Sequence, residues 1–231
     1  MALPPALELR GIAKLYGPTA ALKATSIRLD GGETMALLGP NGSGKTTLLK
    51  IVAGAITPTL GSGFIFGRDM LNDRQALRPE VGLLAAENYL YEDLTAEENL
   101  RFILTMAGSR PVGETLLRAL EEVSLAGHAG ERVRTFSGGM KRRLAIARIL
   151  LLRPRLLLLD EPYNSLDADG LELMDSSVRN HARKGGAVML ATHDAERGLA
   201  LADSVAVLER GALAYVGPVQ GYRVEHAHYV G

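Results

Sequence analysis

The longest apolar runs of this chain lie in its second half and have the length of buried strands. Residues 156–159, 188–191 and 205–208 contain only leucine, valine, methionine and alanine. Short continuous runs of this kind suit the strands of a parallel sheet that is buried on both faces. A helical pattern over residues 171–183 separates the first two runs and ends before a pair of glycines. The region therefore predicts a βαβ unit.

The first third of the chain alternates strand patterns with turns, and the middle is helical. Expected strands cover residues 7–10, 26–30, 34–38, 61–66 and 81–84. Expected helices cover residues 46–53, 96–106, 112–123 and 138–152. Thr95 and Ser137 are the expected N-caps, and Thr95 with Glu98 fits a capping box. The whole pattern predicts an α/β core that carries a helical arm.

Composition limits the classes of function. The formal net charge is +0, which argues against a general nucleic-acid binder, and the absence of cysteine excludes disulfides and thiolate chemistry. No run of 18 apolar residues is present, and residues 1–5 lack the basic and apolar regions of a signal peptide, so we expect a cytoplasmic protein. His226 and His228 are close in sequence, but they are more simply interpreted as part of a polar tail than as a metal-binding pair.

The most specific pattern is a glycine-rich loop between an apolar strand and a helix. Residues 39–46 read G-x-x-x-x-G-K-T, in the order that a phosphate cradle requires. Its backbone N–H groups and the positive end of the following helix attract an anion. Lys45 is expected on the β/γ-phosphates and the Thr46 hydroxyl on Mg²⁺. The residues assigned to nucleotide binding here are Gly39, Pro40, Asn41, Gly42, Ser43, Gly44, Lys45, Thr46 and Thr47.

Two acidic residues end the first of the long apolar runs. Asp160 and Glu161 follow four leucines, at the edge of a parallel sheet where ligands bind. We expect Asp160 to hold Mg²⁺ and Glu161 to orient and polarise the attacking water. A turn with solvated acids is the alternative interpretation of Asp-Glu-Pro. The phosphate loop makes the catalytic interpretation the better one.

A second helix start has the composition of an anion site. Ser137, Gly138 and Gly139 open the predicted helix over residues 138–152 and leave free N–H groups there. Standing alone, this pattern is explained more simply by an N-cap followed by permissive glycines. Its meaning depends on the rest of the chain.

Together these residues resemble the ATP-binding subunits of ABC transporters. Residues 39–46 are similar to the family's Walker A motif, 156–160 to Walker B, 137–139 to the signature motif and 165–167 to the D-loop. The resemblance implies a P-loop NTPase fold of ABC type: a RecA-like parallel-sheet core with an antiparallel β subdomain and a helical arm. It also implies a core formed by about residues 1–85 and 154–231, and a helical subdomain over 86–153.

The same resemblance implies site roles and partners. Glu161 stands at the catalytic glutamate position, His193 at the switch histidine that senses the γ-phosphate, and Tyr16 where an aromatic ring stacks on adenine. Two copies would enclose two ATP molecules with Mg²⁺, the Ser137 helix of one copy capping the nucleotide of the other. Membrane permease subunits would use the motion, which places the chain on the cytoplasmic face of the inner membrane.

One position departs from the family pattern. Where the family has a glutamine after the strand at residues 81–84, this chain has Glu87, or Ala86 if the register shifts by one. A carboxylate could bind Mg²⁺ or accept from water, but it cannot donate a hydrogen bond when ionised. We therefore expect Glu87 near the metal, and whether it lowers the ATPase rate or the coupling to a membrane partner is left open by the sequence.

A few positions resemble one subtype, the ATP-binding subunit of the haem exporter of cytochrome c maturation. They are Phe136, Met140, Tyr163 and the segment 196–203. Such a subunit is not expected to bind haem itself. The alternatives are an exporter ATPase for drugs, lipids or lipoproteins, and, in a different class, a soluble ABC ATPase or a weakly hydrolysing nucleotide switch.

Overall fold

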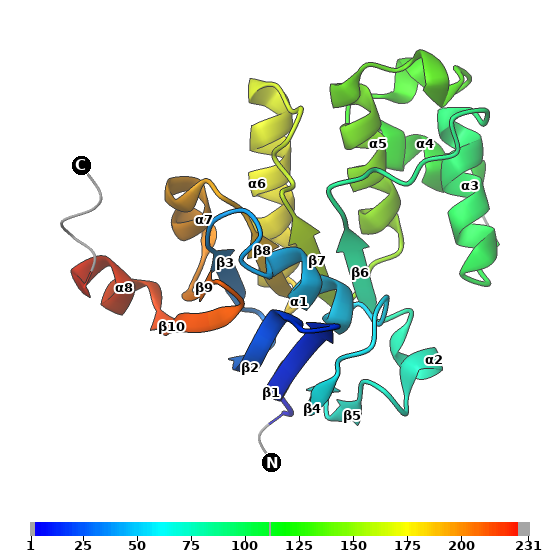
Figure 1. The fold of residues 1–231 in the computed structure, drawn as a ribbon. Helices are drawn as coiled ribbons and strands as arrows, with labels where there is room; N and C mark the ends of the chain where they lie inside the picture. The colour runs from blue at the N-terminus through cyan, green and yellow to red at the C-terminus, as the bar shows by residue number, and fades with distance from the viewer. Residues whose placement is uncertain (1–2, 111, 226–231) are drawn as a thin grey trace.

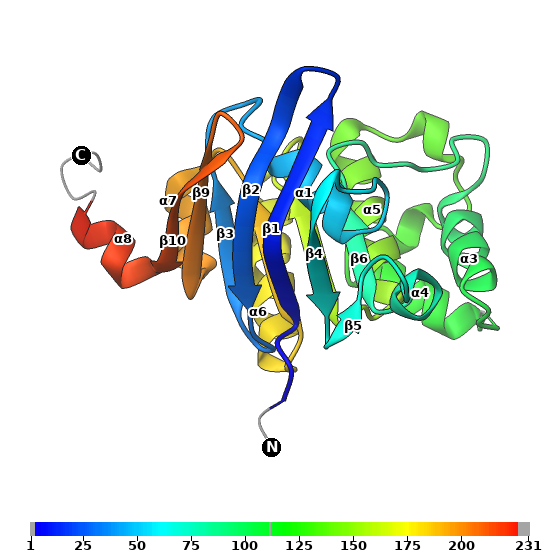
Figure 2. The ribbon, with the colours of Figure 1, turned by 60° about the horizontal axis from the view of Figure 1, so that its bottom comes forward.

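The computed structural model describes residues 3–110 and 112–225 as two sheets with helices packed around them. The antiparallel sheet has the order β2-β1-β4-β5, and the larger sheet has the order β10-β9-β3-β8-β7-β6. All neighbours in the larger sheet are parallel except β9 and β10. Figure 2 shows the antiparallel sheet in front of the larger one, with α6 behind both. The predicted α/β class and its β subdomain are confirmed.

The strands are β1 (Leu7–Tyr16), β2 (Thr19–Leu29), β3 (Thr34–Leu38), β4 (Leu60–Ile65), β5 (Arg68–Asp69), β6 (Val81–Leu84), β7 (Leu156–Asp160), β8 (Ala187–Ala191), β9 (Ser204–Glu209) and β10 (Ala212–Pro218). The helices are α1 (Lys45–Val52), α2 (Arg74–Leu77), α3 (Ala96–Met106), α4 (Gly113–Glu121), α5 (Gly138–Leu151), α6 (Ala168–Arg183), α7 (Ala195–Leu201) and α8 (Val219–Glu225). Two short 3₁₀ turns lie at Ala126–His128 and Val133–Thr135.

Strand β7 is buried on both faces, as its run of leucines predicts. Leu156 and Leu158 pack into the cluster formed with α1 and the antiparallel sheet. Leu157 and Leu159 pack on the opposite side, into the cluster that contains α5 and α6. Because alternate strand residues point to opposite faces, even-numbered residues of β7 face α1 and odd-numbered residues face α5 and α6. The next residue, Asp160, therefore points toward α1.

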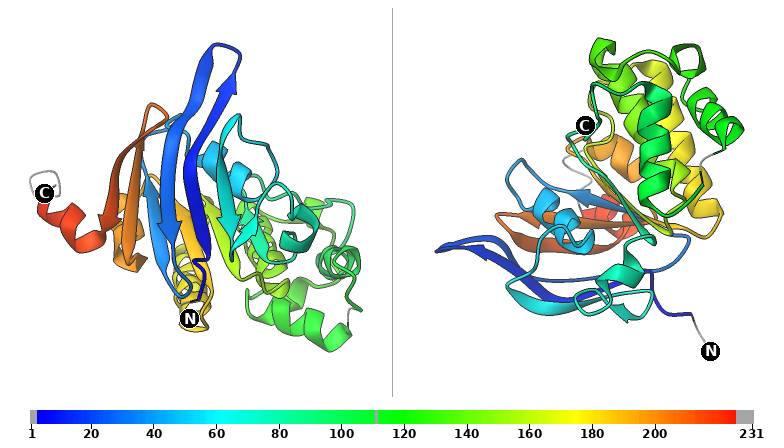
Figure 3. Two further views of the ribbon diagram at one scale, coloured as in Figure 1. Left: turned by 90° about the horizontal axis from the view of Figure 1, so that it is seen from below. Right: turned by 90° about the vertical axis from the view of Figure 1, so that its right-hand side faces the viewer.

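The helices α3, α4 and α5 gather at one end of the molecule, away from β1 and β2 (Figures 1 and 3). Thr95 caps α3 in a complete capping box with Glu98, as predicted. We propose that these helices form the helical subdomain over residues 86–153. Its hydrophobic core continues into the large sheet, since Leu100 and Leu144 share one cluster with Leu157.

Several elements extend the sequence expectation. The hairpin of β1 and β2 is longer than predicted and contains irregular register, and β10, α7 and α8 were not predicted. No helix among the described residues has both the length and the apolarity to cross a membrane. His226 and His228 lie outside the described residues.

Candidate functional site

The loop between β3 and α1 is a crowded cradle in which only glycine fits at two points. Gly39 has φ 143°, and a Cβ there would lie 2.1 Å from the Leu208 carbonyl oxygen. Gly44 has φ 108°, and its Cβ would lie 2.7 Å from the Ala21 carbonyl oxygen. Both angles lie in the region that favours glycine. The backbone can therefore curve tightly and turn its N–H groups inward.

Two polar side chains are buried inside this cradle. Ser43 is 2% exposed, and its Oγ has no hydrogen-bond partner within the part of the chain that the structure describes. Lys45 is also buried, and its Nζ donates to the carbonyl oxygens of Gly39 (2.6 Å) and Pro40 (3.2 Å). A buried hydroxyl without a partner is costly unless a ligand satisfies it. The cradle fits a phosphate group.

The end of β7 closes the same pocket, which has a volume of about 180 Å³. Its lining consists of Ala21, residues 41–47, Asp160 and Glu161. Thr46 hydrogen-bonds the Asp160 carboxylate, while burial raises the pKa of that carboxyl, with the Glu161 charge adding to the rise and Thr46 and Lys45 opposing it. A buried carboxylate beside a threonine hydroxyl is a donor set that suits Mg²⁺. No group of three acidic or histidine side chains gathers into a metal site in residues 3–110 and 112–225. Mg²⁺ would therefore need oxygen ligands from the phosphates as well.

Glu161 and His193 form a pair above the pocket. Glu161 has φ 45°, an unusual left-handed conformation for a residue with a side chain, and its N–H donates to the Ala191 carbonyl oxygen (2.9 Å). Its Oε2 lies 2.8 Å from His193 Nδ1. The Glu161 side chain is 16% exposed and that of His193 is 64% exposed. The structure thus brings together both residues that the sequence assigns to hydrolysis.

The second helix start does not face this pocket. Ser137 is the N-cap of α5, and its Oγ accepts from the Met140 N–H (3.2 Å), which matches the predicted cap. Gly138 and Gly139 lie against Ser165, so the signature segment packs on the D-loop. None of the three residues from 137 to 139 lines the phosphate pocket.

Other predicted residues also lie outside the pocket lining, which does not include Gly39, Pro40 or His193. Tyr16 is half-exposed at the end of β1, with Lys14 Nζ 5.0 Å from its ring centroid. Glu87 is exposed and accepts a hydrogen bond from Tyr89 Oη (3.4 Å). Glu87 is not among the residues that line the pocket with Thr46 and Asp160. Its assignment as a metal ligand stays a prediction.

Sequence reasoning missed Arg142 and Asn88. Arg142 lies on α5, and its guanidinium contacts the backbone of Asp160 and Glu161 as well as the Asn88 side chain. The one signal in the sequence is a charged side chain within a helix that packs against leucine strands. It could not be interpreted because the acceptors are distant along the chain.

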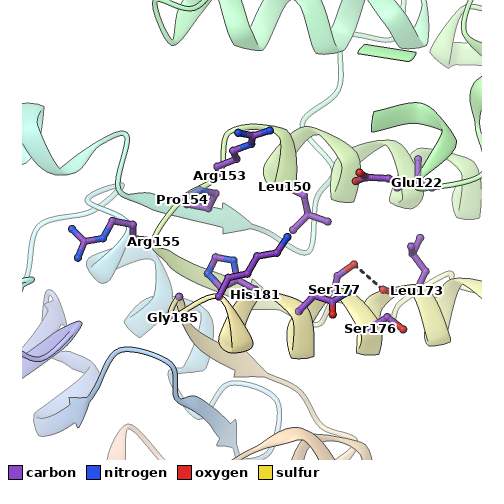
Figure 4. Close-up of a pocket in the computed structure, with 14 residues that line it drawn as sticks. Glu122, Leu150, Arg153, Pro154, Arg155, Leu173, Ser176, Ser177, His181 and Gly185 are labelled. Carbon is purple, nitrogen blue, oxygen red and sulfur yellow. Dashed lines mark hydrogen bonds between the residues drawn. The ribbon is translucent and has the colours of Figure 1, made fainter. Parts of the chain in front are cut away.

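A larger cleft of about 920 Å³ lies elsewhere, between the end of α5 and α6 (Figure 4). Arg153, Arg155 and Lys184 line it together with the helix side chains of α6. His181 packs there onto Gly186, where a Cβ would lie 2.2 Å from the ring Nε2, and burial lowers the pKa of this histidine. None of the nucleotide motifs reaches this cleft.

The order of the phosphate loop, β7 and the signature helix agrees with one family. The model of the ABC transporter family matches residues 22–164. The chain belongs to the ABC transporter family. Two solved structures share the fold. One is an ATP-binding subunit of an ABC transporter, with a TM-score of 0.88 and 27% identity, covering 100% of this chain and 95% of that one. The other is a dimeric ATP-binding cassette in a post-hydrolysis state with ADP and Pi, with a TM-score of 0.85 and 26% identity, covering 92% of this chain and 98% of that one. The predicted ABC-type fold is thus confirmed, and the predicted ATPase class agrees with the family.

Curated relatives of this ABC chain are named as import proteins. A sulfate/thiosulfate import ATP-binding protein of Brucella melitensis is 37% identical over 218 residues, covering 91% of this chain and 60% of the relative. The spermidine/putrescine protein of Nitrosomonas europaea is 35% identical (91% and 59%), and the maltose/maltodextrin protein of Salmonella paratyphi A is 33% identical (97% and 62%). The chain spans about 60% of the length of these relatives. Resemblance to the haem exporter is not confirmed.

Proposed function

We propose that this chain binds and hydrolyses Mg-ATP and passes the resulting motion to membrane subunits. The proposal rests on one pocket. It is lined by a buried hydroxyl without a hydrogen-bond partner among the described residues, a buried lysine and two carboxylates. Ser43, Lys45, Asp160 and Glu161 come from segments more than 100 residues apart, yet all of them line it. A pocket that gathers these groups suits a triphosphate better than any neutral ligand.

The phosphates would displace the loop's own carbonyls from Lys45. At present Lys45 Nζ donates to Gly39 and Pro40, which keeps the ammonium aimed into the cradle. A phosphate oxygen is a stronger acceptor because it is charged. Ser43 Oγ and the N–H groups at the start of α1 would bind the same group. Tyr16 would stack on the adenine ring.

Hydrolysis requires a water aimed at the γ-phosphate. Glu161 would accept a hydrogen bond from that water and orient it, while His193, bonded to Glu161 Oε2, would contact the γ-phosphate. Mg²⁺, held by Thr46, Asp160 and the phosphates, would neutralise charge on the phosphate oxygens. Asp160 carries a raised pKa, so a cation beside it offsets the cost of its buried charge.

The signature segment would act on a second copy of the chain. Ser137, Gly138 and Gly139 lie away from the pocket of their own copy, and their exposed helix start suits the γ-phosphate of a partner. A head-to-tail homodimer then holds two ATP molecules in its seam. Loss of the γ-phosphate removes the shared charge and releases the copies. Permease subunits on the membrane would follow this motion, with the chain on the cytoplasmic face.

The direct test is turnover of Mg-ATP by the purified chain, compared with a Glu161→Gln variant. We expect measurable phosphate release from the parent, and nucleotide binding without release from the variant. Equal turnover by both would contradict the role of Glu161. A parent that binds ATP but releases no phosphate, even with its membrane partner, would instead indicate a nucleotide switch.

The cargo is a separate question, and haem export remains the specific prediction. It depends on Tyr163 and the segment 196–203, which meet in space: Tyr163 Oη donates to Asp175 (3.0 Å), and Arg197 pairs with Asp175 (2.9 Å) and stacks on the Tyr163 ring. Burial and the Asp175 charge raise the pKa of Tyr163, and the Arg197 charge opposes the rise. These contacts explain why the residues occur together in the sequence without reference to any cargo.

Co-purification from membranes distinguishes the cargo alternatives. Recovery with small permeases and a cytochrome c defect on deletion would support haem export, with no haem bound to this chain. A permease for sulfate, polyamines or maltose would place the chain with importers instead, and a drug, lipid or lipoprotein permease with other exporters. Absence of any permease would favour a soluble ATPase.

A further inference from the structure

Arg142 is a long charged side chain in a position that charge usually avoids. It lies in the second turn of α5, and only 1% of its surface is exposed. It is among the largest fully buried side chains of the described residues. Burying an arginine is expensive unless its hydrogen bonds are made. The contacts of its guanidinium are therefore informative.

The guanidinium has five N–H donors, and the structure matches all of them. Nε donates to Pro162 O (3.1 Å), Nη1 to Ala85 O (2.6 Å) and Asn88 Oδ1 (3.3 Å), and Nη2 to Asp160 O (3.1 Å) and Glu161 O (2.8 Å). The four backbone acceptors are neutral carbonyls, and Arg142 forms no ion pair with any described residue. It serves as a connector rather than as half of a salt bridge.

Burial lowers the pKa of Arg142 to about 10, against the opposing effect of the Asp160 and Glu161 charges. The group thus stays charged at neutral pH. Hydrogen bonds from a charged donor are stronger than neutral ones. Arg142 therefore links α5 strongly to the backbone after β7.

One end of this connection is the backbone of Glu161. The residue sits at φ 45°, a conformation that costs free energy for a residue with a side chain. Arg142 donates hydrogen bonds to the carbonyl oxygen of Glu161 and to those of the residues before and after it. The Glu161 N–H donates to the Ala191 carbonyl oxygen. These bonds hold the carboxylate where it reaches His193.

The other end is the helical arm. Arg142 is fixed to α5, whose N-cap is Ser137, and its Nη1 reaches the segment that leaves β6 through Ala85 and Asn88. A shift of α5 or of this segment would move the guanidinium. The carbonyls of Asp160 and Glu161 would then lose partners that no other described side chain supplies.

We propose that Arg142 is a positioning residue that couples the helical arm to ATP hydrolysis by holding the Glu161 backbone in its left-handed conformation. The proposal rests on the role of Glu161 in hydrolysis given above. Arg142 would not touch the nucleotide. It would transmit the position of the signature helix and of the segment at Ala85 to the hydrolytic carboxylate.

The test compares Arg142→Lys with Arg148→Lys. Lysine keeps the charge but lacks the planar fork that reaches five acceptors. Arg148 is a matched control, since it lies on the same helix and its guanidinium donates to the backbone carbonyl of Tyr89. We expect kcat of Arg142→Lys to fall by about 10²-fold, the scale of a misplaced catalytic group. KM and ADP affinity should stay within about twofold of the parent, and Arg148→Lys should hydrolyse normally.

Hydrogen exchange provides a readout independent of turnover. Amides of residues 160–164 should exchange faster in Arg142→Lys than in the parent or in Arg148→Lys, with the phosphate loop unchanged. Parental kcat in Arg142→Lys would overturn the proposal, as would a loss of ADP affinity that matches the loss of kcat. Parental turnover by Glu161→Gln is a different failure, because it would remove the proposed hydrolytic role itself.

Discussion

The two helix starts that carry this chain's anion-binding sequences are built in opposite ways. The start of α1 is enclosed: Lys45 is buried, Ser43 Oγ lacks a partner, and neighbouring backbone crowds Gly39 and Gly44. The start of α5 is open, and its polar side chain is already used, because Ser137 caps its own helix. The first site lacks only a ligand for its unpaired polar groups. The second site can bind a ligand firmly only when the surface of another molecule covers it.

Sequence motifs of similar chemistry can thus bind the nucleotide of different copies. A buried, unsatisfied cradle binds its ligand alone, because desolvation strengthens each contact. An exposed helix start is weak until another surface excludes water from it. The two sites should therefore respond differently to substitution.

The largest effect is expected when both helix starts are left intact and only the water-orienting group is changed. Glu161→Gln should lower phosphate release by about 10²–10⁴-fold, the usual contribution of a general base. ATP should then hold two copies together for longer. Steady-state turnover and analytical ultracentrifugation with Mg-ATP measure both. Rapid turnover with a persistent dimer would contradict this account.

Removing the charge at the enclosed start should abolish most nucleotide binding. Lys45→Ala deletes a buried charged donor, and hydrogen bonds to charged groups contribute about 1.5–3 kcal/mol, or about 10–10²-fold in affinity. Calorimetric titration with ADP measures the loss. Lys50 is the control, because it lies on α1 but does not line the pocket. Lys50→Ala should bind ADP as the parent does.

Changing the open start should leave single-copy binding intact. Ser137→Ala removes a helix cap, which costs about 1 kcal/mol of stability. ADP affinity should stay at the parental value, while ATP-dependent dimer formation and turnover fall. A parallel loss of ADP affinity would mean that α5 serves its own copy.

The smallest effect concerns two aspartates with opposite pKa shifts. Burial raises the pKa of Asp160, so its folded state favours the protonated form. Its stabilising contribution is complete below the unfolded pKa of 3.8 and is lost as pH rises through the folded value. At neutral pH the buried ionised carboxylate destabilises the fold, and Asp160→Asn should raise the thermal midpoint measured without Mg²⁺.

Asp167 provides the matched comparison near the open start. Hydrogen bonds from Arg143 and from the Gly170 N–H lower its pKa. Its contribution is present above the unfolded pKa of 3.8 and is lost as pH falls through the folded value. Asp167→Asn should therefore lower the midpoint at neutral pH. Scanning calorimetry at pH 7 checks both signs, and equal signs would refute the electrostatic interpretation.

The sequence predicted several local elements because their signals lie close together along the chain. The strand at residues 156–159, the loop between β3 and α1, and the caps at Thr95 and Ser137 all depend on neighbours within a few positions. The carboxyl end of a parallel strand also fixes where Asp160 lies. These features follow from periodicity and turn chemistry alone.

What sequence did not predict depends on long-range contacts. Arg142 is explained only by carbonyls 18 to 57 residues away. The extra length of β1 and β2 comes from pairing in a hairpin whose register shifts interrupt the alternation of polar and apolar residues. Glu87 was placed by counting along the chain, whereas the fold leaves it on the surface beside Tyr89.

In the proposed dimer, one ATP site consists of the enclosed start of one copy and the open start of the other. The most direct measurement mixes two impaired variants, Lys45→Ala and Ser137→Ala, in equal amounts and follows phosphate release at an ATP concentration at which each variant alone turns over slowly. A mixed dimer contains one intact composite site, so random pairing should restore about a quarter of parental turnover. Turnover no higher than that of the separate variants would contradict the claim, because each site would then be complete within one copy.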